Sequence, residues 1–189
     1  MTEDSKVLQF LKDLVTSLIT VAIIVAIGIA VTGTWPFVVA VESGSMKPNL
    51  QPGDIVFLIS PERNGGITTW EEGKEKGYVS FGDYGDVIVY RPNGQGKPII
   101  HRAITYVHKG ERIPALVNGK LVYTDAIAES DGYITQGDNR ITNPVPDQLV
   151  PAALSPLGEK IMPVKEEWVI GVAKFRVPLI GYLRLLIPI

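Results

Sequence analysis

Residues 38–59 read VVAVESGSMKPNLQPGDIVFLI, two short apolar runs joined by a polar loop and a turn. The first run, residues 38–41, stops at a loop that contains Ser45. Pro52, Gly53 and Asp54 then give a turn signal before the second run, residues 55–59, because proline fixes φ and glycine tolerates positive φ. Short apolar runs bounded by turn residues are typical of strands in an all-β domain.

The rest of the chain after residue 59 repeats this pattern, with further strand candidates at residues 87–90, 99–107, 116–117, 121–123, 132–136 and 169–177. Asn118-Gly119 tolerates positive φ and predicts a hairpin. Residues 60–82 lose hydrophobic periodicity, which predicts an exposed insertion whose charged run at 71–76 is a solvated face. The prolines of residues 143–163 predict irregular loop. We therefore expect an all-β, mainly antiparallel domain over residues 37–178.

Before this domain, residues 14–41 contain no charged side chain. Such a stretch exceeds the ~20 residues that a helix needs to cross a membrane. A buried core helix and a cleaved signal peptide are alternatives, but the apolar stretch is long for either. We predict a single uncleaved transmembrane anchor at residues 14–36. The tail at residues 179–189 is apolar but shorter than a span, so a membrane-associated segment or a truncated second anchor is open.

The charges around the anchor predict its direction. Lys6 and Lys12 precede the span, and the first basic residue after it is Lys47. The positive-inside rule then places residues 1–13 in the cytoplasm and the β domain on the outer or lumenal face of a cell membrane. Trp35 and Phe37 suit the outer interface, where aromatic side chains lie at the level of the headgroups.

The composition excludes several kinds of function. A net charge of −2 and a pI of about 5.7 give no basic field for nucleic acid. The 189 residues include no cysteine and two histidines, His101 and His108, which excludes thiolate chemistry and makes a histidine-built metal site improbable. We expect no metal or organic cofactor.

Ser45 is the candidate nucleophile. Serine needs a base within hydrogen-bond reach and donors for the oxyanion before it can attack a peptide bond. Ser43-Gly44-Ser45-Met46 supplies a serine on a tight glycine turn directly after the anchor. Taken alone the motif is weak, because Ser-Gly-Ser is common in loops.

The motifs taken together resemble the type I signal peptidase family. Five occur in the family's order, and they extend over most of residues 38–177: Ser43-Gly44-Ser45-Met46 with Pro48 and Leu50, Gly53-Asp54-Ile55-Val56, Gly85-Asp86-Val87-Ile88-Val89-Tyr90, Ile100-His101-Arg102-Ala103 and Gly137-Asp138-Asn139. Bacterial members use a lysine base, whereas the archaeal and endoplasmic-reticulum branch has a histidine at the place of His101. The chain resembles this Ser-His branch, and neutral imidazole suits the role of base near neutral pH.

The resemblance implies roles for further residues. In this branch a second aspartate after the Gly-Asp-Asn turn completes the triad, which favours Asp147 as the residue that orients His101 and Asp138 as a supporting carboxylate. Residues 140–142 stand as an insertion between the two aspartates relative to the family pattern. The oxyanion donors would be the Ser45 N–H and the Ser43 hydroxyl.

A few other residues near these motifs have simpler interpretations. Arg102 could pair with a carboxylate such as Asp138. We expect Met46 and Leu50 to pack, and His108, at an odd spacing from His101, to lie on the other face of its strand.

The implied function is a membrane-bound serine endopeptidase that removes signal peptides from secretory preproteins, cutting after small residues. Its partners would be preprotein signal peptides, the lipid bilayer and the secretion translocon, with no nucleic acid. Two alternatives are a Ser-Lys self-processing peptidase with Lys97 or Lys109 as base, and a non-catalytic membrane-anchored β module that acts as an accessory subunit.

Overall fold

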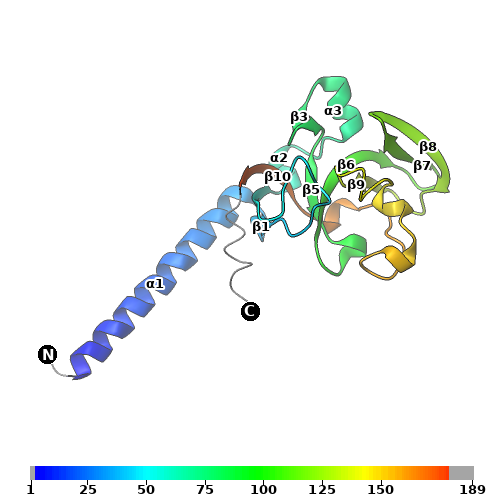
Figure 1. Ribbon diagram of the computed structural model, residues 1–189. Coiled ribbons are helices and arrows are strands. Elements are labelled where there is room, and N and C mark those ends of the chain that lie inside the picture. Colours follow the sequence, from blue (N-terminus) through cyan, green and yellow to red (C-terminus); the bar gives the residue numbers. More distant parts are fainter. Residues whose placement is uncertain (1–2, 179–189) are drawn as a thin grey trace.

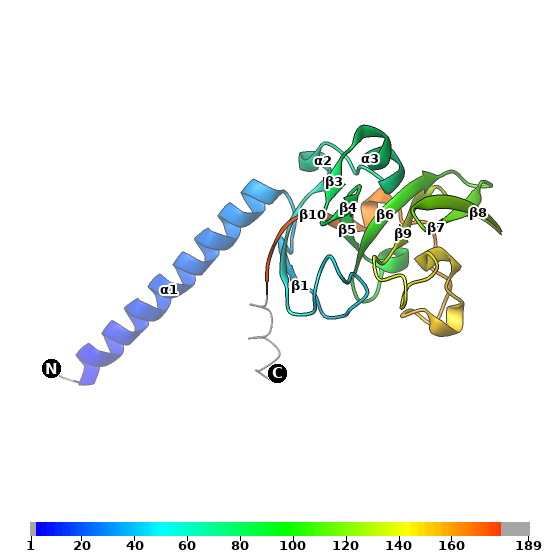
Figure 2. The same ribbon diagram turned by 45° about the horizontal axis from the view of Figure 1, so that its top comes forward.

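The computed structural model describes residues 3–178 and begins with one long helix, α1 (Glu3–Thr32). Residues 5–32 are long and apolar enough to cross a membrane, and none of their most apolar window is buried inside the described chain. Figures 1 and 2 show α1 extending away from the folded domain. The helix begins well before residue 14, the predicted start of the anchor. It ends before residue 36, the predicted end, because Gly33 adopts a left-handed φ of 73°. The apolar tail at residues 179–189 lies outside the described residues.

The rest of the described chain is mainly antiparallel β structure. Its strands are β1 (Val38–Ala40), β2 (Ile55–Ile59), β3 (Val79–Ser80), β4 (Asp83–Tyr84), β5 (Val87–Tyr90), β6 (Ile99–Val107), β7 (Arg112–Val117), β8 (Lys120–Ile127), β9 (Gly132–Gln136) and β10 (Val169–Val177). Six strands form one sheet in the order β1-β2-β10-β5-β6-β9, with every neighbouring pair antiparallel. The prediction of a mainly antiparallel β domain behind one N-terminal apolar helix is confirmed.

The other four strands form two two-stranded ribbons, one of β3 with β4 and one of β7 with β8. The predicted hairpin is the second ribbon: β7 ends at Val117, β8 starts at Lys120, and both loop residues have positive φ, 49° at Asn118 and 70° at Gly119. These angles belong to a type I′ turn, whose twist matches that of the flanking strands. Residues 143–163 contain no strand, as the prolines predicted, but two short 3-10 turns, η2 (Asp147–Leu149) and η3 (Ala152–Leu154).

The segment at residues 60–82 differs from the exposed insertion that we expected. It contains two helices, α2 (Pro61–Asn64) and α3 (Trp70–Lys76). Helix α3 begins with a capping box in which Thr69 and Glu72 bond each other's backbone N–H, so the charged run is helical. Trp70 is 3% exposed and packs in the core, which burial of its large apolar area favours. The segment is therefore part of the folded domain, although most of its charged run does face solvent.

The end of α1 is fastened to the β domain by side chains from the same segment. Arg63 Nη1 donates to the carbonyls of Ala30 and Val31, with 2.7 Å to Val31 O. The Ser60 N–H donates to Thr32 O at 2.8 Å. A cation at a helix C-terminus satisfies unpaired carbonyls and opposes the negative end of the dipole. The helix and the domain are thus joined by specific bonds as well as by the chain.

Candidate active site

Ser45 lies in the loop between β1 and β2, and the base of this loop is closed by backbone bonds. The Val41 N–H donates to Asp54 O at 2.9 Å. Met46 and Leu50 are fully buried in the same core cluster as Val41, so they pack, as expected. Ser45 therefore lies on a loop that is held at its base by a backbone hydrogen bond and, directly after the serine, by the buried side chain of Met46.

The Gly137-Asp138-Asn139 turn is bound directly to this loop. The Asn139 N–H donates to Ser45 O at 2.8 Å, and Asn139 Nδ2 donates to Gly44 O at 3.0 Å. A β-carbon at Gly137 would lie 2.6 Å from Ser45 O, closer than a real contact allows, so only glycine permits this approach. The motif that follows β9 therefore positions the backbone of the serine.

His101 on β6 contacts Asp147, the first residue of η2. The distance from His101 Nδ1 to Asp147 Oδ2 is 2.7 Å, and each side chain is 8% exposed. With Nδ1 facing a carboxylate, we assign the proton of the neutral ring to Nδ1, which leaves Nε2 as an acceptor. The structure thus brings together two of the residues that the sequence singled out, His101 and Asp147.

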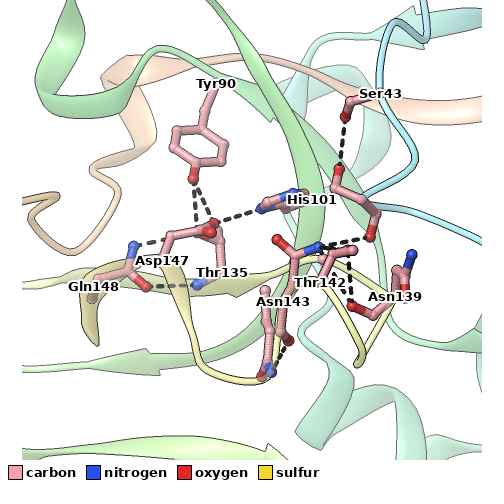
Figure 3. A network of polar contacts seen from close by, with 12 residues as sticks. Ser43, Tyr90, His101, Thr135, Asn139, Thr142, Asn143, Asp147 and Gln148 are labelled. Atoms are coloured by element: carbon pink, nitrogen blue, oxygen red, sulfur yellow. Dashed lines mark hydrogen bonds and ion pairs between the residues drawn. The ribbon is translucent and has the colours of Figure 1, made fainter. Parts of the chain in front are cut away.

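Two buried hydroxyl groups also bind the Asp147 carboxylate. Tyr90 Oη donates to Asp147 Oδ2 at 2.7 Å, and Thr135 Oγ1 donates to the same oxygen at 2.7 Å. Burial, followed by the charge of Asp147, raises the pKa of Tyr90 well above its ordinary value of 10.0. Figure 3 shows Tyr90, Thr135 and His101 gathered around Asp147. One carboxylate oxygen therefore receives three hydrogen bonds.

The two serines of the motif contact each other. Ser43 Oγ donates to Ser45 Oγ at 3.2 Å. Ser43 is exposed and Ser45 is partly exposed, so both hydroxyls are accessible from the surface. Within residues 3–178 no hydrogen bond joins Ser45 to His101; catalytic hydrogen bonds often form fully only once substrate is bound.

Asp138 lies elsewhere and binds Arg102. Its two oxygens accept from Arg102 Nε at 2.9 Å and from Nη2 at 2.7 Å, and Asn49 Nδ2 donates to it at 2.8 Å. The Arg102 side chain is fully buried and that of Asp138 is 2% exposed. The expected pairing of Arg102 with Asp138 is confirmed. The structure places Asp138 against Arg102 and the serine loop, through Asn49, and not against His101.

The alternative bases lie in less suitable surroundings. Lys97 is exposed and forms an ion pair with Glu42 Oε2. Lys109 is exposed, and so is His108, whose Nδ1 lies 3.5 Å from Asp131. In the described part of the chain no three His, Asp or Glu side chains group as metal ligands would.

Sequence reasoning assigned no role to three side chains of this site: Tyr90, Thr135 and Gln148. Tyr90 and Thr135 read as ordinary strand formers, because aromatic and β-branched residues are common in strands. Gln148, which is buried, exchanges hydrogen bonds with Thr135, from the Thr135 N–H to Oε1 at 3.0 Å and from Nε2 to Oγ1 at 3.2 Å. The only available signal was Tyr90 at the end of an apolar run, since a buried tyrosine hydroxyl usually needs a partner.

The described chain thus combines an antiparallel β domain, an apolar helix long enough to cross a membrane, a loop that carries Ser45 and a buried His101–Asp147 pair. A model of the family described as "Signal peptidase, peptidase S26" matches residues 11–154. The chain belongs to this signal peptidase family, whose members are peptidases. The resemblance found in the five motifs is confirmed.

The relatives identify the branch. The chain is similar to the signal peptidase complex catalytic subunit SEC11 of Komagataella phaffii, at 31% identity over 85% of this chain and 71% of the relative. It is 27% identical to the corresponding subunit of Aspergillus oryzae and 29% identical to that of Candida tropicalis, in each case over 79% of this chain and 64% of the relative. The chain thus belongs to the SEC11-type, endoplasmic-reticulum and archaeal branch, and spans about two thirds of the length of these relatives.

Proposed function

We propose that this protein is a membrane-bound serine endopeptidase that removes N-terminal signal peptides from secretory preproteins, with Ser45, His101 and Asp147 as its catalytic groups. The observation that carries the proposal is the buried contact of His101 Nδ1 with Asp147 at 2.7 Å, beside a serine loop that the Gly-Asp-Asn turn holds in place. Family membership supports the reaction class, and the geometry supports the roles.

In the proposed mechanism Ser45 Oγ attacks the scissile carbonyl while His101 Nε2 takes its proton. The Asp147 carboxylate balances the imidazolium that forms, and His101 then returns the proton to the leaving amine. Water then attacks the acyl group: His101 takes the proton of the water and returns it to Ser45 Oγ as the acyl group leaves. The Ser45 N–H and the Ser43 hydroxyl, 3.2 Å from Ser45 Oγ, are the proposed oxyanion donors. Asp138 is a supporting carboxylate, because it binds Arg102 on β6 and Asn49 in the serine loop.

The substrate would lie beside β1. This strand is at the edge of the six-stranded sheet and leads directly into the serine loop. An extended peptide could add to that edge, taking its register from main-chain bonds and its selectivity for small side chains from shallow pockets.

The proposed location is the membrane, crossed once by α1. Lys6 and Lys12 place the N-terminus in the cytoplasm, so that the β domain lies on the outer or lumenal face. There it would meet signal peptides that lie in the bilayer near the secretion translocon. The relatives named above are catalytic subunits of a signal peptidase complex, so this chain could also act with partner subunits.

The experiment is cleavage of a preprotein by the purified full chain beside Ser45→Ala and His101→Ala. Both variants should lose cleavage, because the nucleophile or the base is gone. His108→Ala is the matched control and should cleave normally, since His108 is exposed and contacts Asp131 rather than a residue of the proposed site. Equal cleavage by all four proteins would contradict the proposal, and activity in His101→Ala with loss in Lys97→Ala would favour the Ser-Lys alternative.

Ser43→Ala tests the oxyanion assignment. Loss of one such donor costs about 100- to 1,000-fold in turnover, so cleavage should fall while the folded state survives. Unchanged turnover in this variant would remove Ser43 from the oxyanion site.

A further inference from the structure

The side chains around Asp147 come from three adjacent strands. Tyr90 lies on β5, His101 on β6 and Thr135 on β9. Ile88 is the partner of His101 in the sheet, and Tyr90 is two residues further on, so it shares the face of Ile88. Thr135 is the partner of Ala103, two residues from His101. The sheet register therefore directs all three polar groups at one carboxylate.

Each hydroxyl is held as a donor. Tyr90 and Thr135 are both 0% exposed, so neither can exchange its partner for water. Gln148 Nε2 donates to Thr135 Oγ1 at 3.2 Å. The hydroxyl oxygens of Tyr90 and Thr135 also lie 3.0 Å from each other, but each is closer to Asp147 Oδ2, at 2.7 Å, and a charged acceptor makes the stronger hydrogen bond, so we assign both protons to Asp147. Tyr90 keeps its proton because burial raises its pKa. Asp147 thus receives donors from both hydroxyls as long as the fold is intact.

The surroundings of Asp147 stabilise its negative charge without a permanent cation. A buried charge is unfavourable unless it is paired or hydrogen-bonded. Asp147 meets that cost with two neutral hydroxyls and one histidine, and the only permanent cation next to His101 along β6, Arg102, is bound to Asp138 instead. The hydroxyls therefore stabilise the carboxylate without a fixed positive charge that would compete with the imidazolium.

We propose that Tyr90 and Thr135 are positioning residues for the reaction: their hydroxyls fix the Asp147 carboxylate against His101 Nδ1 and so present Nε2 to the serine. The inference rests on the proposed function of Ser45, His101 and Asp147. Neither residue touches substrate; each acts through Asp147.

Removal of one donor has two consequences. Asp147 is held less firmly, which lowers kcat and leaves KM unchanged, because the ground-state contacts of the substrate are not altered. Its negative charge is also less compensated, which favours the protonated imidazole. Among residues 3–178, the titratable side chain hydrogen-bonded to this pair is Tyr90 from β5. The acid limb of the rate profile should therefore move to higher pH in Tyr90→Phe.

The chain contains a matched control. Tyr78 Oη donates to Asp86 Oδ1 at 2.8 Å. In this second tyrosine–aspartate bond, the carboxylate makes no hydrogen bond to a histidine of residues 3–178. Tyr90→Phe and Tyr78→Phe each delete one hydroxyl from such a bond. If Tyr90 only stabilises the fold, the two variants should behave alike.

The experiment measures kcat, KM and the pH dependence of the rate in the full chain. Tyr90→Phe should lower kcat roughly 10- to 100-fold, the range expected for one hydrogen bond to a charged group, whereas Tyr78→Phe should keep the original kcat and the original acid limb. In an Asp147→Asn background, Tyr90→Phe should have no further effect on kcat.

Three outcomes would overturn the inference while Ser45→Ala and His101→Ala remain inactive: equal kcat in the two tyrosine variants, an unmoved acid limb of the rate profile in Tyr90→Phe, or additive effects of Tyr90→Phe and Asp147→Asn. If Tyr90→Phe does not fold, Thr135→Val, which removes the second donor, must show the same coupling to Asp147→Asn. Activity retained in Ser45→Ala would instead refute the proposed function itself.

Discussion

His101 and Arg102 are neighbours on β6, and each binds an aspartate from the loop that follows β9. Successive residues of a strand point to opposite faces, so the two pairs lie on opposite sides of the sheet. His101 binds Asp147 at 2.7 Å, and Arg102 binds Asp138 through Nε and Nη2 at 2.9 and 2.7 Å. The loop after β9 therefore makes a buried hydrogen bond to one face of this strand and a buried ion pair with the other.

The two pairs differ in whether the basic side chain still has a free hydrogen-bonding group. Besides binding Asp138, Arg102 donates through Nη1 to the carbonyls of Ser80 at 2.9 Å and Gly85 at 2.8 Å, so its guanidinium is fully used. Its charge is permanent, because guanidinium does not lose its proton in proteins. His101 keeps one ring nitrogen that can accept a proton from another partner and return it. The Arg102 pair is suited to holding the loop, and the His101 pair to moving a proton.

The largest expected effect is on the side of His101. Asp147→Asn should lower the rate of preprotein cleavage by about 10,000-fold, because a neutral amide cannot balance the imidazolium that forms in the reaction. Thermal unfolding of the variant should remain cooperative, since the hydroxyls of Tyr90 and Thr135 can still donate to the amide oxygen. A rate within tenfold of the original would show that this carboxylate does not take part.

The next effect is on the side of Arg102. Arg102→Met should reduce the free energy of unfolding by about 3–5 kcal/mol, because Asp138 would stay buried without its cation. The double variant Arg102→Met/Asp138→Asn should recover part of this loss, since both charges are then removed together. Denaturant unfolding in a mild detergent measures the three proteins. A double variant less stable than the single one would refute the assignment of the pair as a structural contact.

The sequence predicted features that depend on local patterns and missed those that depend on contacts between distant segments. The strands followed from local patterns: β2, β5, β6, β9 and β10 were all expected at their observed residues because apolar runs and turn signals are local properties. Trp70 was not expected in the core, because its segment lacks periodicity and its burial depends on β6 and the β7–β8 ribbon.

The site was only partly predictable for a related reason. Ser45, His101 and Asp147 could be selected from chemistry and from motif order. The roles of Tyr90 and Thr135 depend on register, since β5 and β9 must be the neighbours of β6 before their hydroxyls reach one carboxylate. Strand order is a long-range property, and no pattern within β5 or β9 encodes it.

A smaller effect concerns the second tyrosine–aspartate bond, from Tyr78 to Asp86. Burial, followed by the bond to Asp86, raises the pKa of Tyr78 to about 12. An unfolded tyrosine ionises near 10, so between pH 10 and 12 the unfolded chain binds fewer protons than the folded chain. This contribution to stability is complete below pH 10 and is lost as the pH rises toward 12.

Tyr78→Phe should therefore make the loss of stability between pH 10 and 12 less steep. Denaturation midpoints of both proteins across this range measure the slopes. An unchanged slope would mean that Tyr78 titrates alike in the folded and unfolded chains.

The smallest expected effect is on the surface ion pair nearest the serines. Lys97 binds Glu42, which precedes Ser43, but the two side chains are 74% and 46% exposed. Exposed pairs contribute about 0–1 kcal/mol, so Lys97→Ala should change the free energy of unfolding by no more than that. A lysine that serves as a base must be desolvated enough to lose its proton, and Lys97 is not. Cleavage should therefore stay within about twofold of the original rate. Loss of cleavage in Lys97→Ala, with the fold intact, would assign the role of base to Lys97, in the loop before β6. His101 would then have no catalytic role that distinguishes it from Arg102.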